Sequence, residues 1–184
     1  GATGPGGARG EGQGLEGTTG AVRGATDTAD LAEGGGRRRY GQTTPSELPM
    51  KFNMSVRTPL GVAGRITPWN FPIAIPAWKG MAALVCGNTV VIKPASLTPL
   101  SVIMLAEALE EAGLPRGVWN VVTGGGKEVG EPMLRNDKVK VISFTGSTAV
   151  VREISVACGP SFMHLHLDLG GKNGVRSSEG NSVE

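Results

Sequence analysis

The sequence lacks an excess of charge of one sign, long apolar runs and a cysteine framework. Lys plus Arg is 18 and Asp plus Glu is 16, so the formal net charge is only +2 over 184 residues. This balance disfavours nucleic acid or an anionic membrane as a partner. No apolar run approaches the roughly eighteen residues of a membrane span, and no signal peptide opens the sequence. Because two cysteines make no disulfide framework, we expect a soluble, cytoplasmic protein.

Large apolar residues are sparse at both ends of the sequence. Residues 1–36 hold 13 of the 30 glycines, and such a segment buries too little surface to offset the entropy of ordering. We therefore expect residues 1–36 to be Gly-rich and poorly ordered. A Gly/Arg-rich RNA-binding tail is disfavoured, because the few arginines are scattered among at least as many acidic residues. Residues 173–184 form a second core-poor tail.

Between these ends, short apolar runs typical of strands alternate with helical patterns. The strand candidates, mostly rich in β-branched residues, are 61–67, 89–93, 118–122, 138–144 and 164–169. The helix candidates are 76–86, 99–112, 127–135 and 148–158. The clearest is 99–112, which Thr98 can cap and Gly113 ends. The alternation predicts an α/β fold, with helices on the faces of a parallel sheet.

The segments that follow the five strand candidates carry glycines, hydroxyl groups or a lysine. In chain order they are TPWNFP, KPAS, TGGGKEVG, FTGST and GGKN. Ligands of parallel sheets bind beyond the carboxyl ends of the strands, and such residues suit a nucleotide. No generic motif fits, since GGGKEVG lacks the last glycine of G-x-G-x-x-G and the hydroxyl of a phosphate loop. Taken alone, these glycines are more often part of an ordinary turn.

The combination of segments, in this order and spacing, is more specific than any one of them. ITPWNFP, GNTVVIKPAS, FTGST and LDLGGKN closely resemble motifs of the aldehyde dehydrogenase superfamily. Within it, TVVIKPASLTPLS and NVVTGGGKEVG look most like bacterial semialdehyde dehydrogenases. The resemblance implies a Rossmann-like NAD(P)-binding domain over 61–172, with flanking helices. It also implies that residues 37–60 form a bridging segment of the kind that makes homo-oligomers.

The resemblance implies the NAD(P)-dependent oxidation of an aldehyde to a carboxylic acid. In the family a cysteine thiolate attacks the aldehyde, hydride passes to the nicotinamide, and a glutamate-activated water releases the acid. Asn70 matches the asparagine whose amide holds the developing oxyanion, and the prolines around it limit its backbone. Asp168 matches the general base, although the family has Glu, and its shorter stem is expected to weaken the release step.

The resemblance also implies a set of cofactor-binding residues. Lys93 matches a lysine that contacts the adenosine ribose. Ser96 stands where many NAD-preferring members carry a glutamate, and without that carboxylate a 2′-phosphate is tolerable, which suggests NADP or dual use. The full set is Ile66, Thr67, Pro68, Trp69, Lys93, Ala95, Ser96, Gly126, Gly130, Phe144, Thr145, Gly146, Ser147, Leu169 and Gly170.

The turn FTGST is expected to begin a helix at Gly146 and Ser147. In the family, the amides and the dipole of this helix face the pyrophosphate of the cofactor. The family has a glycine a few residues later, where this sequence has Val151. A β-branched residue is unfavourable wherever the backbone must approach a ligand, so Val151 is expected to weaken cofactor binding.

The nucleophilic cysteine of the family has no counterpart in this sequence. Cys86 and Cys158 match structural positions, and Cys86 is expected to pack as a small hydrophobe. We therefore expect a fragment: most of a cofactor domain without the half that performs the covalent chemistry, inactive alone. The alternative hypothesis is a non-catalytic nucleotide-binding or structural fragment.

His164, His166 and Asp168 leave a third hypothesis open. They alternate, so they share one face of a strand, and His-x-His-x-Asp resembles the H-x-H-x-D-H signature of metallo-β-lactamase-like hydrolases. Leu169 replaces the last histidine of that signature, and the sequence contains only two histidines. A half-exposed strand face is therefore favoured over a metal site.

Overall fold

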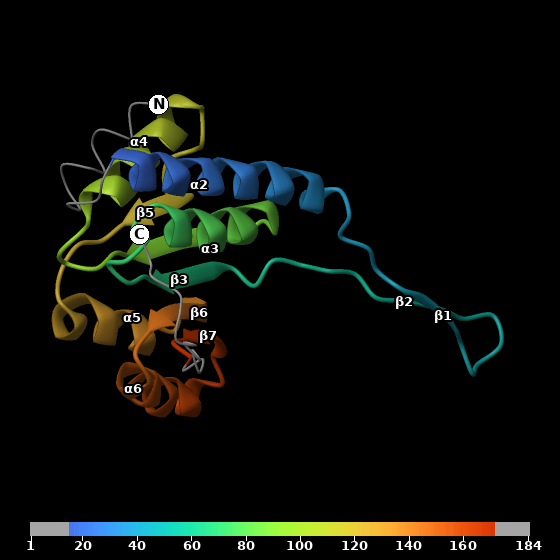
Figure 1. Cartoon of the computed structure of the whole chain (residues 1–184). Coiled ribbons are helices and arrows are strands. Elements are labelled where there is room, and N and C mark those ends of the chain that lie inside the picture. Colours follow the sequence, from blue (N-terminus) through green and yellow to red (C-terminus); the bar gives the residue numbers. More distant parts are fainter. Residues whose placement is uncertain (1–14, 172–184) are drawn as a thin grey trace, which may run out of the picture.

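The computed structural model describes residues 15–171 and shows helices on both faces of a parallel sheet (Figure 1). The sheet has five parallel strands in the order β5-β4-β3-β6-β7. The strands are β3 Val62–Ile66, β4 Thr89–Lys93, β5 Trp119–Val121, β6 Val139–Gly146 and β7 His164–Leu169. Each overlaps one of the five runs predicted from the sequence, so the expected α/β architecture is confirmed.

The helices connect the strands in two groups, one on each face of the sheet (Figure 1). One face carries α3 Ala74–Val85 and α4 Leu100–Glu111. The other carries the π-helical turn η1 Gly126–Gly130, α5 Glu131–Arg135 and α6 Thr148–Cys158, and a 3₁₀ turn, η2 Gly159–Ser161, leads into β7. The chain returns from the edge strand β5 to β6, beside β3, so the order of connection reverses there. Open α/β sheets bind ligands at such a switch point.

Helix α4 is not capped by Thr98, which corrects one expectation from the sequence. The N-cap residue is Pro99, and no side chain caps the helix. The Thr98 hydroxyl instead donates to the carbonyl of Trp69 at 3.5 Å, which links the start of α4 to the segment after β3. Gly113 follows the end of α4 as expected, with a φ of +92° that suits a glycine.

Each face of the sheet buries its own apolar cluster. The cluster under α3 and α4 contains Ala63, Ala83, Val90, Ile92, Val102 and Trp119. The cluster under α5 and α6 contains Met133, Leu134, Val139, Ile142, Phe144, Val151, Ile154 and Cys158. Ile92 and Ile142 are fully buried, one in each cluster. A parallel sheet that is covered on both faces accounts for the nearly continuous apolar character of the strands.

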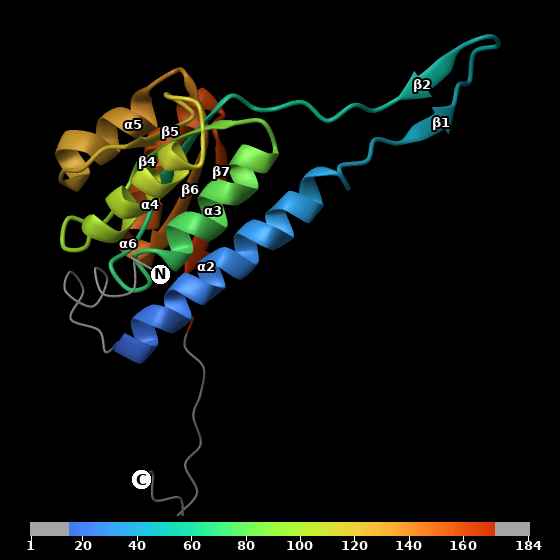
Figure 2. The same cartoon turned by 90° about the horizontal axis from the view of Figure 1, so that it is seen from above.

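Residues 15–36 form helix α2 (Leu15–Gly36), where the sequence led us to expect a poorly ordered segment. This helix runs alongside α3 in both views (Figures 1 and 2). Ala25 of α2 is buried with Ile73 and Ala77, and the indole of Trp78 donates to a backbone carbonyl of α2 at 3.2 Å. Packing against α3 therefore orders a segment of low intrinsic helix propensity.

The sequence also predicts a poorly ordered Gly-rich start and a core-poor tail for residues 1–14 and 173–184, which lie outside the described residues. The predicted domain boundaries stay predictions. Among residues 15–171, no helix combines the length and the apolar character that crossing a membrane requires.

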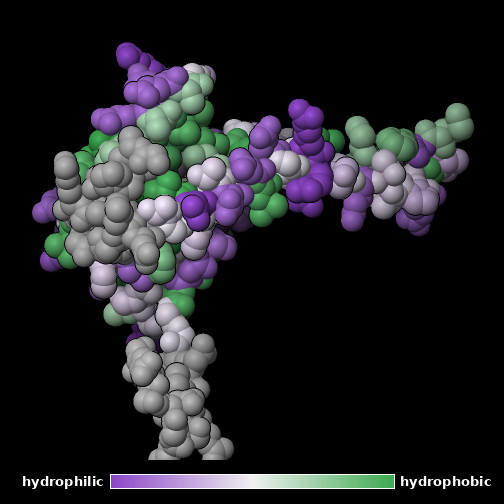
Figure 3. All heavy atoms as spheres, turned by 45° about the horizontal axis from the view of Figure 1, so that its top comes forward, coloured by the Kyte–Doolittle hydropathy of each residue, from purple (hydrophilic) through white to green (hydrophobic). Residues whose placement is uncertain are grey.

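An antiparallel hairpin projects from the α/β body (Figures 1 and 2). Its strands are β1 Thr43–Pro45 and β2 Phe52–Met54, which lie within the predicted bridging segment 37–60. All six strand residues are exposed. The exposed large apolar side chains of the hairpin are Leu48, Met50, Phe52 and Met54, and Figure 3 shows apolar surface at its outer end. Clustered exposed apolar side chains of this kind often mark a surface for association.

Candidate functional site

The segment after β3 holds Asn70 in an exposed and tightly restricted turn. Asn70 and its neighbours Trp69 and Phe71 are exposed, whereas Pro72 is buried. Phe71 has a φ of +77°, a left-handed conformation that is costly for a bulky residue. Strain at Phe71 and the buried Pro72 therefore fix the backbone on the C-terminal side of Asn70. The prolines predicted this rigidity, but the left-handed residue was missed because no glycine marks it.

The carboxyl end of β4 holds a buried cation. Lys93 is 6% exposed, and its Nζ donates to the carbonyl of Pro94 at 3.0 Å. Burial lowers the pKa of Lys93, while the negative charge of Glu128 acts in the opposite direction. Ser96 is exposed, and its hydroxyl donates to the carbonyl of Gly124 at 3.2 Å. Lys93 thus keeps N–H donors beyond the one used within the chain.

Helix α6 begins directly after Gly146 and Ser147, where the sequence predicted a helix start, and Ser147 is its N-cap residue. Its backbone is extended, and its hydroxyl accepts a hydrogen bond from the N–H of Val150 at 3.5 Å. The positive end of the helix dipole therefore lies directly after β6. The side chain of Val151 is buried in the cluster under α6. Val151 is not among the residues that line the cavity beside α6.

A cavity of about 670 Å³ lies on the α5 and α6 face of the sheet, beside the last residues of β3 and β4. Its size lies within the range typical of small-molecule sites. Four predicted cofactor residues line it: Ile66, Lys93, Gly126 and Gly130. A Cβ added to Gly126 would have no heavy atom within 4 Å, so space remains open beside this glycine. We call this space the α6-side cavity.

The other predicted cofactor residues do not line the α6-side cavity. Phe144 is buried in the apolar cluster, and Thr145 faces the opposite side of the sheet. The rest are Thr67, Pro68, Trp69, Ala95, Ser96, Gly146, Ser147, Leu169 and Gly170. Sequence reasoning missed several residues that do line the cavity: Lys127, Glu131, Leu134, Arg135, Val150, Arg152, Glu153, Ile154, Val156 and Ala157. They lie mostly on helices, where no motif marks them.

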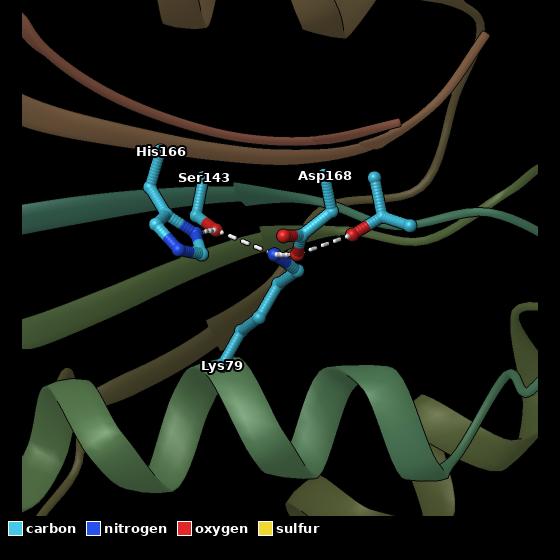
Figure 4. Close-up of polar contacts among 5 residues, drawn as sticks. Lys79, Ser143, His166 and Asp168 are labelled. Carbon is cyan, nitrogen blue, oxygen red and sulfur yellow. Dashed lines mark hydrogen bonds and ion pairs between the residues drawn. The ribbon is translucent and has the colours of Figure 1, made fainter. Parts of the chain in front are cut away.

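On the α3 face of the sheet, Asp168 forms an ion pair with Lys79 (Figure 4). Thr145 donates to the same carboxylate oxygen at 3.2 Å, and Lys79 Nζ also donates to Ser143 Oγ at 2.8 Å. The hydrogen bond from Lys79, together with its positive charge, lowers the pKa of Asp168 although partial burial acts against this. Asp168 is therefore held as a carboxylate, and this makes it a weaker base than a free one.

Lys79 is the main residue of this cluster that sequence reasoning missed. It lies on α3 in the segment PAWKG, which carries no motif of its own. Its side chain is only 8% exposed, whereas that of Asp168 is 51% exposed. The Lys79 side chain reaches from α3 to Ser143 of β6 and Asp168 of β7, and this tertiary contact brings the two together.

The metal-site hypothesis is not supported. Within residues 15–171, no group of three His, Cys, Asp or Glu side chains is placed to hold a metal ion. Asp168 is paired with Lys79, and His166 Nδ1 lies 3.1 Å from Ser143 Oγ (Figure 4). The alternation of the strand was predicted correctly, but His166 and Asp168 contact residues of β6 and α3.

Asp168→Asn is expected to lower the free energy of unfolding at neutral pH by up to about 1 kcal/mol, since the half-exposed pair is screened by solvent. The folded-state pKa of Asp168 is lowered, so its contribution is present above the unfolded pKa of about 3.9. It is lost as the pH falls through the folded pKa. The difference from wild type in urea unfolding should therefore shrink below about pH 4.

A matched control for this pH series is Glu110→Gln, which removes an exposed carboxylate paired with Arg116. This variant should change stability little at any pH. A stability difference for Asp168→Asn that stays constant from neutral to strongly acidic pH would contradict the ion pair with Lys79.

The fold and the strand-end geometry define a Rossmann-like α/β domain. The chain belongs to the aldehyde dehydrogenase family, whose family model matches residues 8–176. It is 49% identical over 137 residues to 2,5-dioxopentanoate dehydrogenase of Saccharolobus solfataricus, covering 73% of this chain and 29% of that protein. It is 46% identical over 142 residues to alpha-ketoglutaric semialdehyde dehydrogenase of Bacillus subtilis, covering 77% and 29%.

Solved structures agree with this family assignment. An E. coli NADP-dependent enzyme matches with a TM-score of 0.90 and 38% identity, over 92% of this chain and 35% of that one. Betaine aldehyde dehydrogenase of Staphylococcus aureus, in complex with NAD+, matches with a TM-score of 0.90 and 32% identity, over 94% and 35%. The chain thus spans about 29% of the length of the two curated relatives described above.

Proposed function

We propose that this chain provides the NAD(P)-binding part of an enzyme that oxidises an aldehyde to a carboxylic acid. The observation that carries the proposal is the α6-side cavity, where the buried cation of Lys93 and the first turns of α6 meet beyond the carboxyl ends of the strands. Family relatives support it: one is named for NADP and one solved neighbour is a complex with NAD+. Relatives named for semialdehydes favour an aldehyde of that class.

The residues present suit such a cofactor. Lys93 has free donors for ribose hydroxyls, and the open space beside Gly126 allows close approach to the backbone. The amides that begin α6, after Ser147, are oriented to bind phosphate oxygens. A bound nicotinamide would accept the hydride of the substrate. The other predicted cofactor residues do not line the α6-side cavity, and their contacts with a cofactor stay a prediction.

The catalytic roles go to two residues at the carboxyl ends of the strands. Asn70, exposed in its restricted turn, would donate an amide N–H to the developing oxyanion. Asp168 would orient or deprotonate a water, and Lys79 must release it for the second role. Neither cysteine is assigned the role of nucleophile. Cys158 is buried, and burial raises the pKa of its thiol. Cys86 is the C-cap residue of α3 and does not line the α6-side cavity.

The test is a titration of the chain with NAD and NADP, followed by tryptophan fluorescence. We expect saturable binding, with NADP binding at least as tightly as NAD, because Ser96 offers no carboxylate to repel a 2′-phosphate. Lys93→Met should weaken binding of both, whereas Lys138→Met, an exposed lysine that does not line the cavity, should not.

One result would count against this proposal. No saturable binding by a chain that circular dichroism shows to be folded would refute the cofactor site. Binding without aldehyde oxidation is the expected result for this chain alone, because neither of its cysteines is assigned the role of nucleophile.

We also propose that the β1–β2 hairpin contacts a second copy of the chain. Its exposed apolar residues, including Phe52 and the fully exposed Met50, lie away from the α/β body (Figure 3). Sedimentation analysis should show an oligomer that Phe52→Asp shifts toward monomer. A wild-type chain that stays monomeric at high concentration would refute this contact.

A further inference from the structure

Cys86 lines a second cavity, of about 640 Å³, between α3 and the sheet. We call this space the α3-side cavity, and it shares no lining residue with the α6-side cavity. Leu60 and Asn88 also line it, and they precede β3 and β4 as Cys86 does β4. Asp168 lines the same space from the carboxyl end of β7. Cys86 therefore lies at the amino ends of the strands, opposite the edge that carries Asp168.

Two arginines place positive charge near Cys86. Arg65 of β3 lines the same cavity, and burial lowers its pKa while the charge of Cys86 acts in the opposite direction, so the two side chains are electrostatic neighbours. Arg39 Nη1 donates to the carbonyl of Val85, directly before Cys86, at 3.1 Å. This hydrogen bond offsets the negative end of the α3 dipole. Electropositive surroundings of this kind are typical of reactive thiols.

Arg65 is a buried cation that lacks an anionic partner. It is only 9% exposed, and its Nε is buried with no hydrogen-bond partner in the part of the chain that the structure describes. The ion pairs among residues 15–171 involve other residues: Lys79–Asp168, Arg116–Glu110 and Arg135–Glu131. Because an unpaired buried charge is strongly unfavourable, an anion formed beside Arg65 would be stabilised.

The other cysteine of the chain cannot form a disulfide with Cys86. Cys158 is 1% exposed and packs in the cluster under α6, on the opposite face of the sheet. Cys86, by contrast, is half-buried, so small reagents can reach it. The sequence contains only these two cysteines. A sulfenic acid formed at Cys86 therefore meets no resolving thiol within the chain, and further oxidation is its remaining route.

We propose that Cys86 is a modification site for peroxides, and that its sulfinate product pairs with the guanidinium of Arg65. The thiolate sulfur attacks one peroxide oxygen, the O–O bond breaks and the other oxygen leaves as hydroxide, so the peroxide gains the two electrons that the sulfur loses. A second peroxide adds another oxygen to the sulfenic acid and leaves as water. The resulting sulfinic acid ionises at neutral pH. Its two oxygens match the two parallel N–H donors of a guanidinium.

The test exposes the folded 184-residue chain to hydrogen peroxide and follows both cysteines by peptide mass spectrometry. Cys86 should gain two oxygen atoms at least about tenfold faster than Cys158, because burial shields the second thiol. Arg65→Met should slow the oxidation of Cys86 at least about fivefold, because the negative charge of the reacting atoms loses its neighbouring cation. Arg116→Met, at an exposed arginine, should leave the rate unchanged.

Urea unfolding separates the proposed ion pair from an effect on access alone. Oxidation should raise the urea concentration at which the wild-type chain unfolds, because the sulfinate gives the buried cation a partner. In Arg65→Met the same oxidation should lower it, because the sulfinate then lacks a counter-charge. Cys86→Ser, treated in the same way, corrects for the oxidation of methionines. If Arg65→Met fails to fold, Arg65→Lys, which loses the two-pronged geometry, should gain less stability on oxidation than wild type.

Three results would overturn the proposal: equal oxidation rates of Cys86 and Cys158, equal rates in wild type and a folded Arg65→Met, or oxidation that destabilises wild type relative to Cys86→Ser. Binding of NAD(P) should be the same before and after oxidation, because Cys86 does not line the α6-side cavity. A failure here therefore leaves the cofactor site unaffected, and a failure of the cofactor titration leaves this site untouched.

Discussion

Gly80→Ala is expected to destabilise the chain by about 2 kcal/mol. A Cβ at Gly80 would lie 2.1 Å from Cζ3 of Trp119, whose ring is buried in the cluster under α3. Overpacking of this kind costs up to about 3 kcal/mol, and the better helix propensity of alanine returns about 1 kcal/mol. Urea unfolding followed by circular dichroism measures the difference.

The matched control for this prediction is Gly24→Ala, on the neighbouring helix α2. A Cβ at Gly24 would meet no heavy atom within 4 Å, so the substitution should stabilise the chain by about 0.5–1 kcal/mol. Combining Gly80→Ala with Trp119→Leu should cost less than the two single changes together, because the smaller side chain removes the clash. Wild-type stability of Gly80→Ala would show that α3 does not press on Trp119.

The strands were predictable because their signal is local. Runs such as 89–93 and 164–169 combine β-branched or alternating residues with turn signals on either side, and the structure places strands over the same residues. Helix α2 was not predictable, because its glycines disfavour order and its packing against α3, which buries Ala25, stabilises it. Propensity could not reveal those contacts, which join residues far apart in the sequence.

The candidate site also contains both residues that the sequence predicted and residues that it could not predict. Asn70, Lys93 and Ser147 follow or end strands, so their sequence motifs are sufficient to place them at the carboxyl ends of the sheet. No sequence motif marks Lys79 or Arg65. Lys79 is on a helix and Arg65 lies within a strand, and each gains its environment only from tertiary packing.

Strand β6 has an apolar face and a polar face on opposite sides of the sheet. Ile142 and Phe144 are buried in the cluster under α6, whereas Ser143 and Thr145 line the α3-side cavity. Side chains alternate between the faces of a strand, so four consecutive residues separate an apolar face from a polar one. Strand β6 therefore packs one face into the apolar core under α6 and presents its other face to the space between α3 and the sheet.

Ser147→Asp is expected to weaken NAD(P) binding by roughly 100-fold without loss of helix α6. Asp is as good an N-cap as Ser, and its charge is favourable at a helix N-terminus. The same carboxylate would repel the phosphates proposed to bind there. Two unit charges 4 Å apart interact by about 4 kcal/mol near a protein surface, and salt reduces this toward the roughly 2.7 kcal/mol of a 100-fold loss.

Two control variants isolate this charge at Ser147. Ser147→Thr keeps a capping hydroxyl without charge, so it should bind both cofactors nearly as wild type does. Asn53→Asp adds the same charge on the exposed hairpin, away from the α6-side cavity, and should leave binding unchanged. If Ser147→Asp still binds as tightly as wild type, the phosphates do not lie at the start of α6. Weak binding by Ser147→Thr as well would instead indicate that the cap itself, not the charge, controls the site.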